Sequence, residues 1–252
     1  MTEPIIEVRN LVAKYGEKTI LDDISVDIYK NEVTVILGAS GGGKTTFMKN
    51  IIRLIEPFSG SVKIFGSEIT DMDELEYNEI LKKIGMLFQN GALLNSINIF
   101  ENISIPLEQH TNLSFSMRKK IIKKKLDLVN LSHAIYLLPA ELSGGMKKRA
   151  ALARAIVLDP EILFFDEPSA GLDPITSANL DKLILSLKNQ LQISLVVVTH
   201  ELASIRRIAD RIIFLDKGDL VFHGVLADVE KCEHPVVKEF FAEGTAFTAT
   251  NE

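Results

Sequence analysis

Hydrophobic residues alternate with polar ones over the first part of the chain. Ile6 and Val8, and later Val26 and Ile28, are each separated by one polar residue, which is the pattern of half-buried strands in an antiparallel sheet. Residues 33–37 (VTVIL) are almost wholly apolar and rich in β-branched side chains, as is typical of a strand covered on both faces. The chain therefore begins with antiparallel strands and continues into a buried one.

A glycine-rich loop interrupts this run, and a helical pattern follows it. Four of the six residues from 38 to 43 are glycine. The apolar residues of the next segment recur at i, i+3, i+4 and i+7, on one helical face: Met48, Ile51, Ile52 and Ile55. Pro57 bounds that segment. The predicted order is strand, glycine loop, helix.

Further strand-like runs alternate with helical segments. The runs are residues 61–65, 84–88, 162–165, 194–199 and 211–215. Residues 91–158 are mostly helical in pattern, and residues 178–188 form a separate helix. Strands alternating with helices predict βαβ units and a mainly parallel sheet. We expect one domain over residues 1–243, with the helical block 93–157 inserted in it, and a short, loosely ordered tail over 244–252.

Composition narrows the class of protein. The chain has 252 residues, 46% of them apolar and 25% charged, with a net charge of -6 and one cysteine. This predicts a sizeable core and excludes an intrachain disulfide framework. No segment approaches the ~18–20 continuous apolar residues of a membrane span, and the start of the chain lacks a secretory or organellar pattern. We expect a soluble, cytoplasmic chain whose membrane role, if it has one, comes through a partner.

The glycine loop matches the phosphate-binding pattern G-x-x-x-x-G-K-[ST]. Its N–H groups can surround phosphate oxygens, and the following helix adds positive potential. Lys44 then supplies a charge to the β- and γ-phosphates, and Thr45 supplies a hydroxyl to Mg²⁺. The candidate nucleotide-binding residues here are Gly38, Ala39, Ser40, Gly41, Gly42, Gly43, Lys44, Thr45 and Thr46.

The same loop also matches G-x-S-x-G, the nucleophile elbow of serine hydrolases. Ser40 would be the nucleophile, and Asp166 and His200 follow in the order of that fold. This alternative leaves Lys44 and Thr45 without a role, whereas a phosphate site uses every position of the loop.

Two carboxylates end the apolar run 162–165. In a phosphate site, Asp166 would hold Mg²⁺, directly or through water, and Glu167 would orient or deprotonate the attacking water. The alternative is a plain exit from a strand into a loop.

Ser143 and two glycines precede another predicted helix, which begins near Met146. Ser143 is placed to cap that helix, and Gly144 and Gly145 leave its first N–H groups accessible to an anion. Helix capping alone is the structural alternative. One phosphate loop and one spare anion site suggest two chains that close on shared nucleotides.

Six motifs occur in one order along the chain: 38–45 (GASGGGKT), Gln89, 142–145 (LSGG), 166–167 (DE), 169–173 (SAGLD) and His200. In this order they resemble the ATPase subunit of ABC transporters over nearly the whole chain. The resemblance implies the fold of that family: an α/β P-loop NTPase with a RecA-like parallel-sheet core, an antiparallel β-subdomain and an inserted helical subdomain. It also implies a homodimer that hydrolyses ATP with Mg²⁺.

The resemblance gives further residues a role. It implies that Tyr15 stacks on adenine, although a tyrosine packed beside the turn at Gly16 is the alternative. Gln89 would contact Mg²⁺ or the lytic water, and would report to the membrane partner. Asp166 is the expected Mg²⁺ ligand and Glu167 the expected catalytic residue.

Other implied roles concern the second subunit and the γ-phosphate. Ser143, Gly144 and Gly145 would contact the nucleotide bound by the other subunit. Asp173 would lie at the dimer contact. His200 would sense the γ-phosphate.

A narrower resemblance concerns the cargo. Residues 88–93 (FQNGAL), 100–102 (FEN) and 106–111 (PLEQHT) are similar to the Mla/MCE-type lipid transporter ATPase. Met146, where most ABC ATPases carry glutamine, agrees with that branch. This implies a phospholipid-trafficking motor on the cytoplasmic face of the inner membrane. Its implied partners are a permease dimer, an MCE-domain protein and often a STAS-domain subunit. The other possibilities are a small-solute importer, for example for amino acids, and a soluble ABC protein acting on DNA repair or ribosomes.

A basic stretch over residues 118–125 remains without a role. It holds six positive charges in eight residues. Anionic membrane or nucleic acid could bind it, but the buried side that Ile121, Ile122 and Leu126 give the stretch favours a solvated helix face.

Overall fold

A fully buried strand precedes the glycine loop, as its apolar run predicts. In the computed structural model, which describes residues 3–39 and 41–246, this strand is β3 (Val33–Gly38), and all six of its residues are buried. It pairs in parallel with β9 (Arg211–Asp216). β9 pairs antiparallel with β10 (Asp219–Val225), whose residues are mostly exposed or half-buried. β10 therefore has the position of an edge strand.

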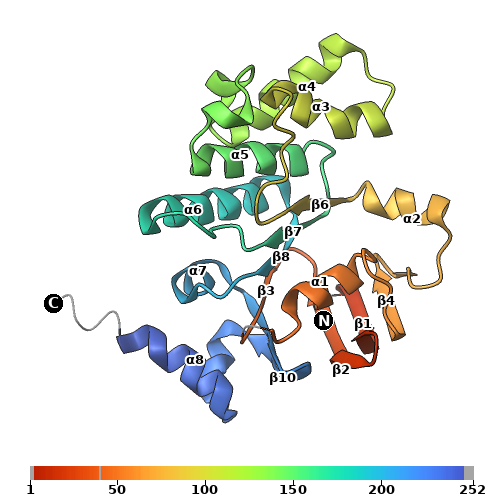
Figure 1. The fold of residues 1–252 in the computed structure, drawn as a ribbon, viewed down its shortest axis with the longest axis vertical. Coiled ribbons are helices and arrows are strands. Elements are labelled where there is room, and N and C mark those ends of the chain that lie inside the picture. Colours follow the sequence, from red (N-terminus) through yellow and green to blue (C-terminus); the bar gives the residue numbers. More distant parts are fainter. Residues whose placement is uncertain (1–2, 40, 247–252) are drawn as a thin grey trace. The chain divides into compact units, whose positions relative to one another are not determined.

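The alternating segments form a separate antiparallel sheet (Figure 1). It contains β1 (Pro4–Tyr15), β2 (Lys18–Tyr29), β4 (Ser59–Ile64) and β5 (Ser67–Glu68), in the order β2-β1-β4-β5. The two alternating patterns pair with each other, because Ile6 lies opposite Ile28 and Val8 lies opposite Val26. All four side chains are buried, which confirms the predicted half-buried strands.

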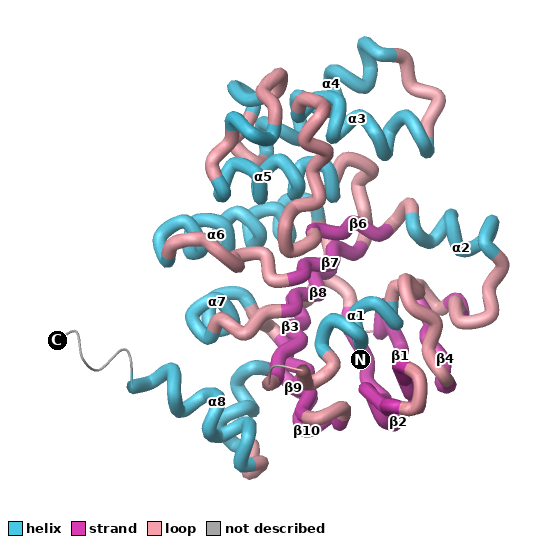
Figure 2. The backbone as a smooth tube through the Cα atoms, in the orientation of Figure 1, coloured by secondary structure: helices cyan, strands magenta, loops and turns pink. Residues whose placement is uncertain are grey.

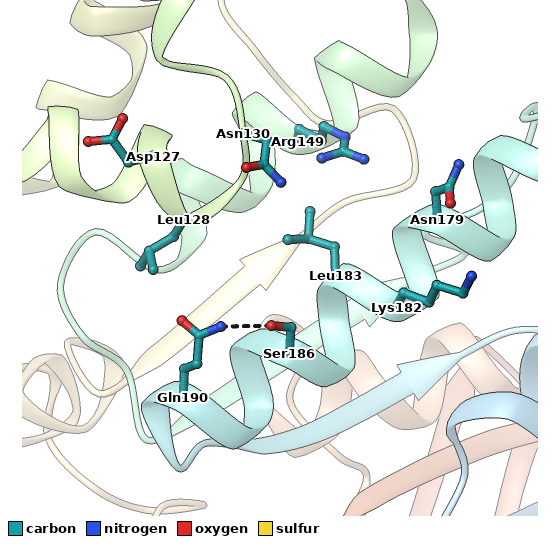
Figure 3. Close-up of a pocket in the computed structure, with 9 residues that line it drawn as sticks. All are labelled: Asp127, Leu128, Asn130, Arg149, Asn179, Lys182, Leu183, Ser186 and Gln190. Atoms are coloured by element: carbon teal, nitrogen blue, oxygen red, sulfur yellow. Dashed lines mark hydrogen bonds between the residues drawn. The ribbon is translucent and has the colours of Figure 1, made fainter.

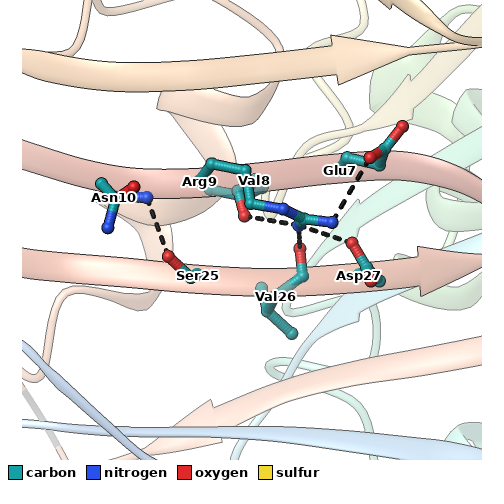
Figure 4. Close-up of polar contacts among 7 residues, drawn as sticks. All are labelled: Glu7, Val8, Arg9, Asn10, Ser25, Val26 and Asp27. Atoms are coloured by element: carbon teal, nitrogen blue, oxygen red, sulfur yellow. Dashed lines mark hydrogen bonds and ion pairs between the residues drawn. The ribbon is translucent and has the colours of Figure 1, made fainter.

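Polar contacts link the exposed sides of β1 and β2 (Figure 4). Arg9 Nη1 lies 2.6 Å from Asp27 Oδ1 and donates to the carbonyl of Val8. The backbone N–H of Asn10 donates to Ser25 Oγ at 2.8 Å. These contacts are exposed or only partly buried, so they hold the register of the two strands more than they contribute to stability.

The helix after the loop, α1 (Lys44–Ile51), is shorter than the sequence predicts. Ile55 continues its apolar pattern but lies beyond the helix, so this part of the prediction is wrong. The chain leaves the helical conformation at Arg53, whose φ is +45°. The Arg53 guanidinium donates to the carbonyl of Met72 at 2.5 Å, and the helix ends where this tertiary contact holds the backbone.

Two compact units make up the chain, residues 1–77 with 196–252 and residues 78–195. The first unit also contains α7 (Leu202–Ile208), the 3-10 helix η3 (Leu226–Lys231) and α8 (Pro235–Ala246). α8 continues past residue 244, where the sequence predicts the tail to begin. Residues 247–252 of that predicted tail lie outside the described residues. No helix within 3–39 and 41–246 combines the length and hydropathy of a membrane span.

The second unit contains the whole of the predicted helical block (Figure 2). Its parallel strands are β6 (Ile84–Leu87) and β7 (Ile162–Asp166). Its helices are α3 (Ile99–His110), α4 (Phe115–Leu128), α5 (Gly144–Ala155) and α6 (Pro174–Leu191), with the 3-10 turns η1 (Ser132–Ala134) and η2 (Pro139–Glu141). α6 is longer than the predicted helix 178–188, because Asp173 caps it ahead of its apolar positions.

Strand β8 (Ser194–Val198) carries the chain from the second unit back to the first. All five of its residues are buried. At its start, Ser194 N–H donates to the carbonyl of Glu161, just before β7. Just after its end, Thr199 N–H donates to the carbonyl of Ile36 in β3. Parallel strands buried on both faces are thus present in both units, as the α/β pattern predicts.

Tyr77, on α2 (Glu74–Leu81), provides a test of packing in the first unit. Its hydroxyl donates to the carbonyl of Ile52, next to the end of α1. Burial raises the pKa of Tyr77 to about 12, although the nearby Arg53 guanidinium opposes this rise. A raised pKa in the folded protein stabilises it below the unfolded value near 10, and this contribution is lost as the pH rises through 12.

We therefore predict that the wild-type chain loses about 2 kcal/mol more unfolding free energy than Tyr77→Phe between pH 9 and 12. Urea titrations at several pH values measure this difference. Tyr136→Phe, which changes an exposed tyrosine, is the control. Parallel pH curves for the wild type and Tyr77→Phe would contradict the prediction.

Candidate functional site

The glycine loop begins where two strands approach closely. Gly38, at the end of β3, has a φ of +145°, and a Cβ at this position would lie 1.8 Å from the carbonyl oxygen of Leu215 on β9. No side chain fits there. The loop then turns back on itself, because Gly42 N–H donates to the carbonyl of Ala39 at 3.0 Å. Lys44 Nζ lies over this turn and donates to the carbonyls of Gly38 and Ala39, both at 2.9 Å.

The N-terminus of α1 has the properties of an anion site. Gly43 is its N-cap, with a φ of +95°, and no side chain caps the helix. The first turn contains no acidic residue, so no carboxylate of that turn competes with a phosphate for the first N–H groups. Thr45 is exposed and Thr46 is half-buried. Ser40, predicted to bind phosphate, lies outside the described residues.

Two further predicted residues belong to the same unit as the loop. Tyr15 ends β1, and about half of its surface is exposed, which leaves the ring available for stacking. His200 is exposed and follows Thr199, whose N–H donates to β3. Tyr15 thus lies at the end of β1, which pairs within the first unit. His200 lies just after β8, next to a residue that is hydrogen-bonded to β3.

In the second unit, the two predicted carboxylates lie at the end of β7, and their backbone conformations differ. Asp166 is the last residue of β7 and is half-buried. Glu167 follows with a φ of +47°, in the left-handed region that non-glycine residues rarely adopt. Such a conformation costs on the order of 1–3 kcal/mol and occurs often at functional sites. The local fold holds the Glu167 backbone against this cost.

Lys148 on α5 connects the segments that carry two of these residues. It is buried, with 7% of its surface exposed. Its ammonium donates to the carbonyl of Gln89, just after β6, at 2.5 Å, and to the carbonyl of Glu167 at 3.4 Å. One cation therefore positions the main chain at both predicted catalytic residues of the second unit.

The predicted second anion site lies at the start of α5, close to α6. Ser143 caps α5, since its hydroxyl accepts the N–H of Met146 at 3.3 Å. This confirms the capping prediction, although the helix begins at Gly144 rather than near Met146. A Cβ on Gly145 would lie 2.9 Å from Thr176 Cγ2 on α6. The Ser143–Gly145 turn is therefore packed against the first turn of α6.

Asp173 caps that first turn of α6. Its carboxylate accepts the N–H groups of Ile175 and Thr176, both at 3.0 Å, and the Thr176 hydroxyl at 2.5 Å. These hydrogen bonds, led by that of the hydroxyl, lower the pKa of Asp173. The contacts bring together two of the predicted dimer-facing segments, Ser143–Gly145 and the residue before α6.

The side-chain amide of one buried asparagine is hydrogen-bonded to the backbone of the segment between β6 and α3. Asn102 is fully buried and donates to the carbonyls of Leu94, Ile97 and Asn98, while its oxygen accepts the N–H of Leu94 at 2.7 Å. Arg154 on α5 donates to the carbonyls of Gly91 and Ala92. The segment is therefore held at several points along its length.

Comparison with known proteins identifies the family to which these features belong. Residues 21–170 match the ABC transporter family, which is more than half of the chain. The chain belongs to the ABC transporter family. The match covers the phosphate loop, the Ser143–Gly145 turn, Asp166 and Glu167, and the resemblance to this family that the sequence showed is confirmed. Like its family, this chain is an ATPase that binds and hydrolyses ATP.

Two relatives and one solved structure extend this comparison. The intermembrane phospholipid transport ATP-binding protein MlaF of Escherichia coli is 38% identical over 94% of this chain and 88% of its own. The "Probable ribonucleotide transport ATP-binding protein mkl" of Mycobacterium leprae is 40% identical over 93% of this chain and 68% of its own. The dimeric ATP-binding cassette MJ0796, bound to ADP and Pi, is 30% identical, with a TM-score of 0.79, over 88% of this chain and 98% of its own. The ABC cassette fold expected from the sequence is therefore confirmed.

Outside these residues, the second unit has a polar hollow of about 530 Å³ beside α6 (Figure 3). Arg149 of α5 lies on one side of it, and Ser186 and Gln190 of α6, which are hydrogen-bonded at 2.7 Å, lie on another. None of the predicted site residues lines it. We assign the hollow no part in nucleotide binding by this ABC cassette.

Sequence reasoning overlooked Lys148. A signal was present, because the residues one turn further along α5, Ala151 and Leu152, are apolar. A lone lysine on the apolar side of a helix needs buried acceptors.

We predict that Lys148→Met lowers the ATPase turnover number at least ~10-fold and leaves the KM for ATP nearly unchanged. The two carbonyls lose a charged donor that contributes about 1.5–3 kcal/mol, and Gln89 and Glu167 lose their common support. Steady-state phosphate release, measured at a temperature at which both variants are fully folded, tests this prediction. Lys147→Met, one residue earlier on α5, is the matched control. Equal turnover in both variants would remove Lys148 from this positioning role.

Proposed function

We propose that this ABC ATPase powers phospholipid transport between membranes by working on a membrane permease. The observation that carries the proposal is the similarity to Escherichia coli MlaF, which extends over 94% of this chain and 88% of that protein. The name of the mycobacterial relative points to ribonucleotides instead, but this chain spans only 68% of that protein's length. The phospholipid assignment therefore rests on the relative that matches nearly end to end.

Triphosphate binding is assigned to the loop 38–46. Its backbone N–H groups and the uncapped N-terminus of α1 supply donors, and Lys44 supplies the cation. Lys44 now donates to two loop carbonyls, so it exchanges these acceptors for phosphate oxygens when ATP binds. Each charge-assisted bond contributes about 1.5–3 kcal/mol. Tyr15 stacks on the adenine, and His200 contacts the γ-phosphate.

The residues assigned to Mg²⁺ are Thr45, Gln89 and Asp166. They offer a hydroxyl, an amide oxygen and a carboxylate, which suit a hard cation that prefers oxygen ligands and keeps several waters. Within the described ranges, no three His, Cys, Asp or Glu side chains form a cluster that could hold a metal. A cation at these residues would also meet the nucleotide's phosphates, whose negative charge it would offset.

Hydrolysis is assigned to Glu167, which accepts a proton from the attacking water. The strained backbone at Glu167 and its contact with Lys148 support this role. The remaining contribution is positioning and electrostatic stabilisation of the transferring phosphoryl group.

The working unit in this proposal is a homodimer. The turn Ser143–Gly145 of each subunit closes on the nucleotide of the other, and Asp173 lies at the contact between them. Two observations support the proposed homodimer. Gly145 and Asp173 both lie against Thr176, at the start of α6, and the solved relative is dimeric.

Coupling to the permease is assigned to the segment between β6 and α3. Phe88 and Leu94 are exposed there, on a backbone held by Asn102 and Arg154. A rigid segment with exposed apolar side chains is suited to a partner surface. The remaining proposed partners are an MCE-domain protein and a STAS-domain subunit, and the proposed location is the cytoplasmic face of the inner membrane.

Glu167→Gln tests the assigned chemistry. We predict that this variant still binds ATP, accumulates as a closed dimer and hydrolyses ATP at least ~10²-fold more slowly, the usual effect of losing a general base. Lys44→Ala should instead lose nucleotide binding. Phosphate release, calorimetry and size-exclusion chromatography with ATP separate the two outcomes.

The matched control is Glu161→Gln, the same change at the other end of β7. Near-normal turnover in Glu167→Gln would show that another group activates the water.

Gentle solubilisation of the tagged chain from its native membrane tests the cargo. We predict co-purification of an integral permease and an MCE-domain protein with bound phospholipid, detected by mass spectrometry. A solute-binding protein would support a small-solute importer instead. Ribosomes or DNA without a membrane protein would support a soluble ABC function.

A further inference from the structure

The basic stretch of the sequence forms one exposed face of α4. Lys119, Lys120, Lys123 and Lys124 are all exposed. Lys119 and Lys123, and Lys120 and Lys124, are each four residues apart, and Lys120 and Lys123 are three apart, so the lysines are neighbours on the surface of the helix. Ile122 and Leu126 of the same helix are buried. No acidic residue occurs between Phe115 and Leu126. We call these four lysines the α4 lysine face.

Two other cations of the stretch are neutralised within the protein. Arg118 Nη2 lies 3.0 Å from Glu108 Oε1, and Lys125, which is buried, pairs with Asp159. In contrast, the four lysines of the face make no ion pair within the described ranges. Lys119 has one other contact, because its ammonium lies 5.7 Å from the centre of the Tyr136 ring. The chain thus leaves four positive charges together although its net charge is -6.

Exposed apolar side chains border this face. Phe115, Met117 and Tyr136 expose 59%, 51% and 58% of their surfaces. The Phe115 ring packs on Phe100 edge to face, with centroids 5.4 Å apart, so its position is defined although its outer edge is open. Lysines beside partly exposed aromatic and sulfur-containing side chains are the combination found where a helix lies on an anionic membrane surface.

We infer that the α4 lysine face docks on anionic phospholipid headgroups, with Met117 and the edges of Phe115 and Tyr136 at the interface. This inference rests on the proposed function, since a motor that drives a membrane permease works beside a bilayer. The face would add a direct lipid contact to those made through the permease.

A lipid surface fits the face better than a nucleic acid does. The face is confined to one helix of 14 residues, about 21 Å long, and the acidic remainder of the chain repels a long polyanion that extends beyond it. A bilayer offers mobile headgroups to a short cationic face without requiring a second basic surface.

Vesicle co-sedimentation of the full chain tests the inference. Vesicles of phosphatidylcholine with about one third phosphatidylglycerol should bind the wild-type chain, and pure phosphatidylcholine should bind it far more weakly. The triple variant Lys120→Gln, Lys123→Gln and Lys124→Gln should lower the partition coefficient about 100-fold. The matched triple change to arginine, which keeps the charge, should retain it. Wild-type binding should weaken as salt is raised.

Three results would overturn the inference: no preference for anionic vesicles, equal binding by the glutamine and arginine variants, or tight binding of a single-stranded polynucleotide by the face with none to vesicles. ATP hydrolysis should be unchanged in both triple variants, which confirms that they fold. Failure here is separable from failure of the proposed function, because the vesicles contain no permease and co-purification of the permease is measured independently.

Discussion

The close approach of Gly38 to the carbonyl of Leu215 is the constraint on which the phosphate loop depends. The parallel ladder of β3 and β9 ends with this pair of residues, and no Cβ can stand between them. The chain must therefore leave β3 with a φ open to glycine, and it turns at once into the loop. At the far end of the loop, a Cβ on Gly43 would lie 2.6 Å from Leu21 Cδ2 on β2. Backbone packing at one end and β2 at the other thus define where α1 starts.

Features of the fold that arise within a single helix or strand were predictable from the sequence. Features that arise from a contact between distant segments were not. The apolar run 33–37 and the alternation at Ile6 and Val8 both favour an extended strand, because only a strand buries these side chains on the intended faces. Both strands are present. The end of α1 is different. The apolar period continues to Ile55, but the backbone leaves the helix at Arg53, whose guanidinium donates to the Met72 carbonyl. Periodicity reports which residues prefer burial, but it carries no information about that contact.

The candidate site shows the same division. The phosphate loop was readable because its chemistry lies in consecutive residues. Ser143 was readable as a cap for the same reason, and its hydrogen bond to Met146 N–H is local. The supporting residue Lys148 was not, because its acceptors lie 59 and 19 residues away along the chain. A buried cation can be suspected from its apolar neighbours, but its partners become visible only in the fold.

Buried polar side chains in the second unit hold the main chain of segments that lie outside the helices and strands. Lys148 holds the carbonyls of Gln89 and Glu167, and Asn102 holds those of Leu94, Ile97 and Asn98. Each of these anchors would be costly to bury without its acceptors, so each resists a change in the loop that it supports. α5 carries both Lys148 and, at its first turn, the Ser143–Gly145 motif. One short helix therefore carries both the motif assigned to the partner's nucleotide and the cation that contacts the main chain of the carboxylate assigned to water activation.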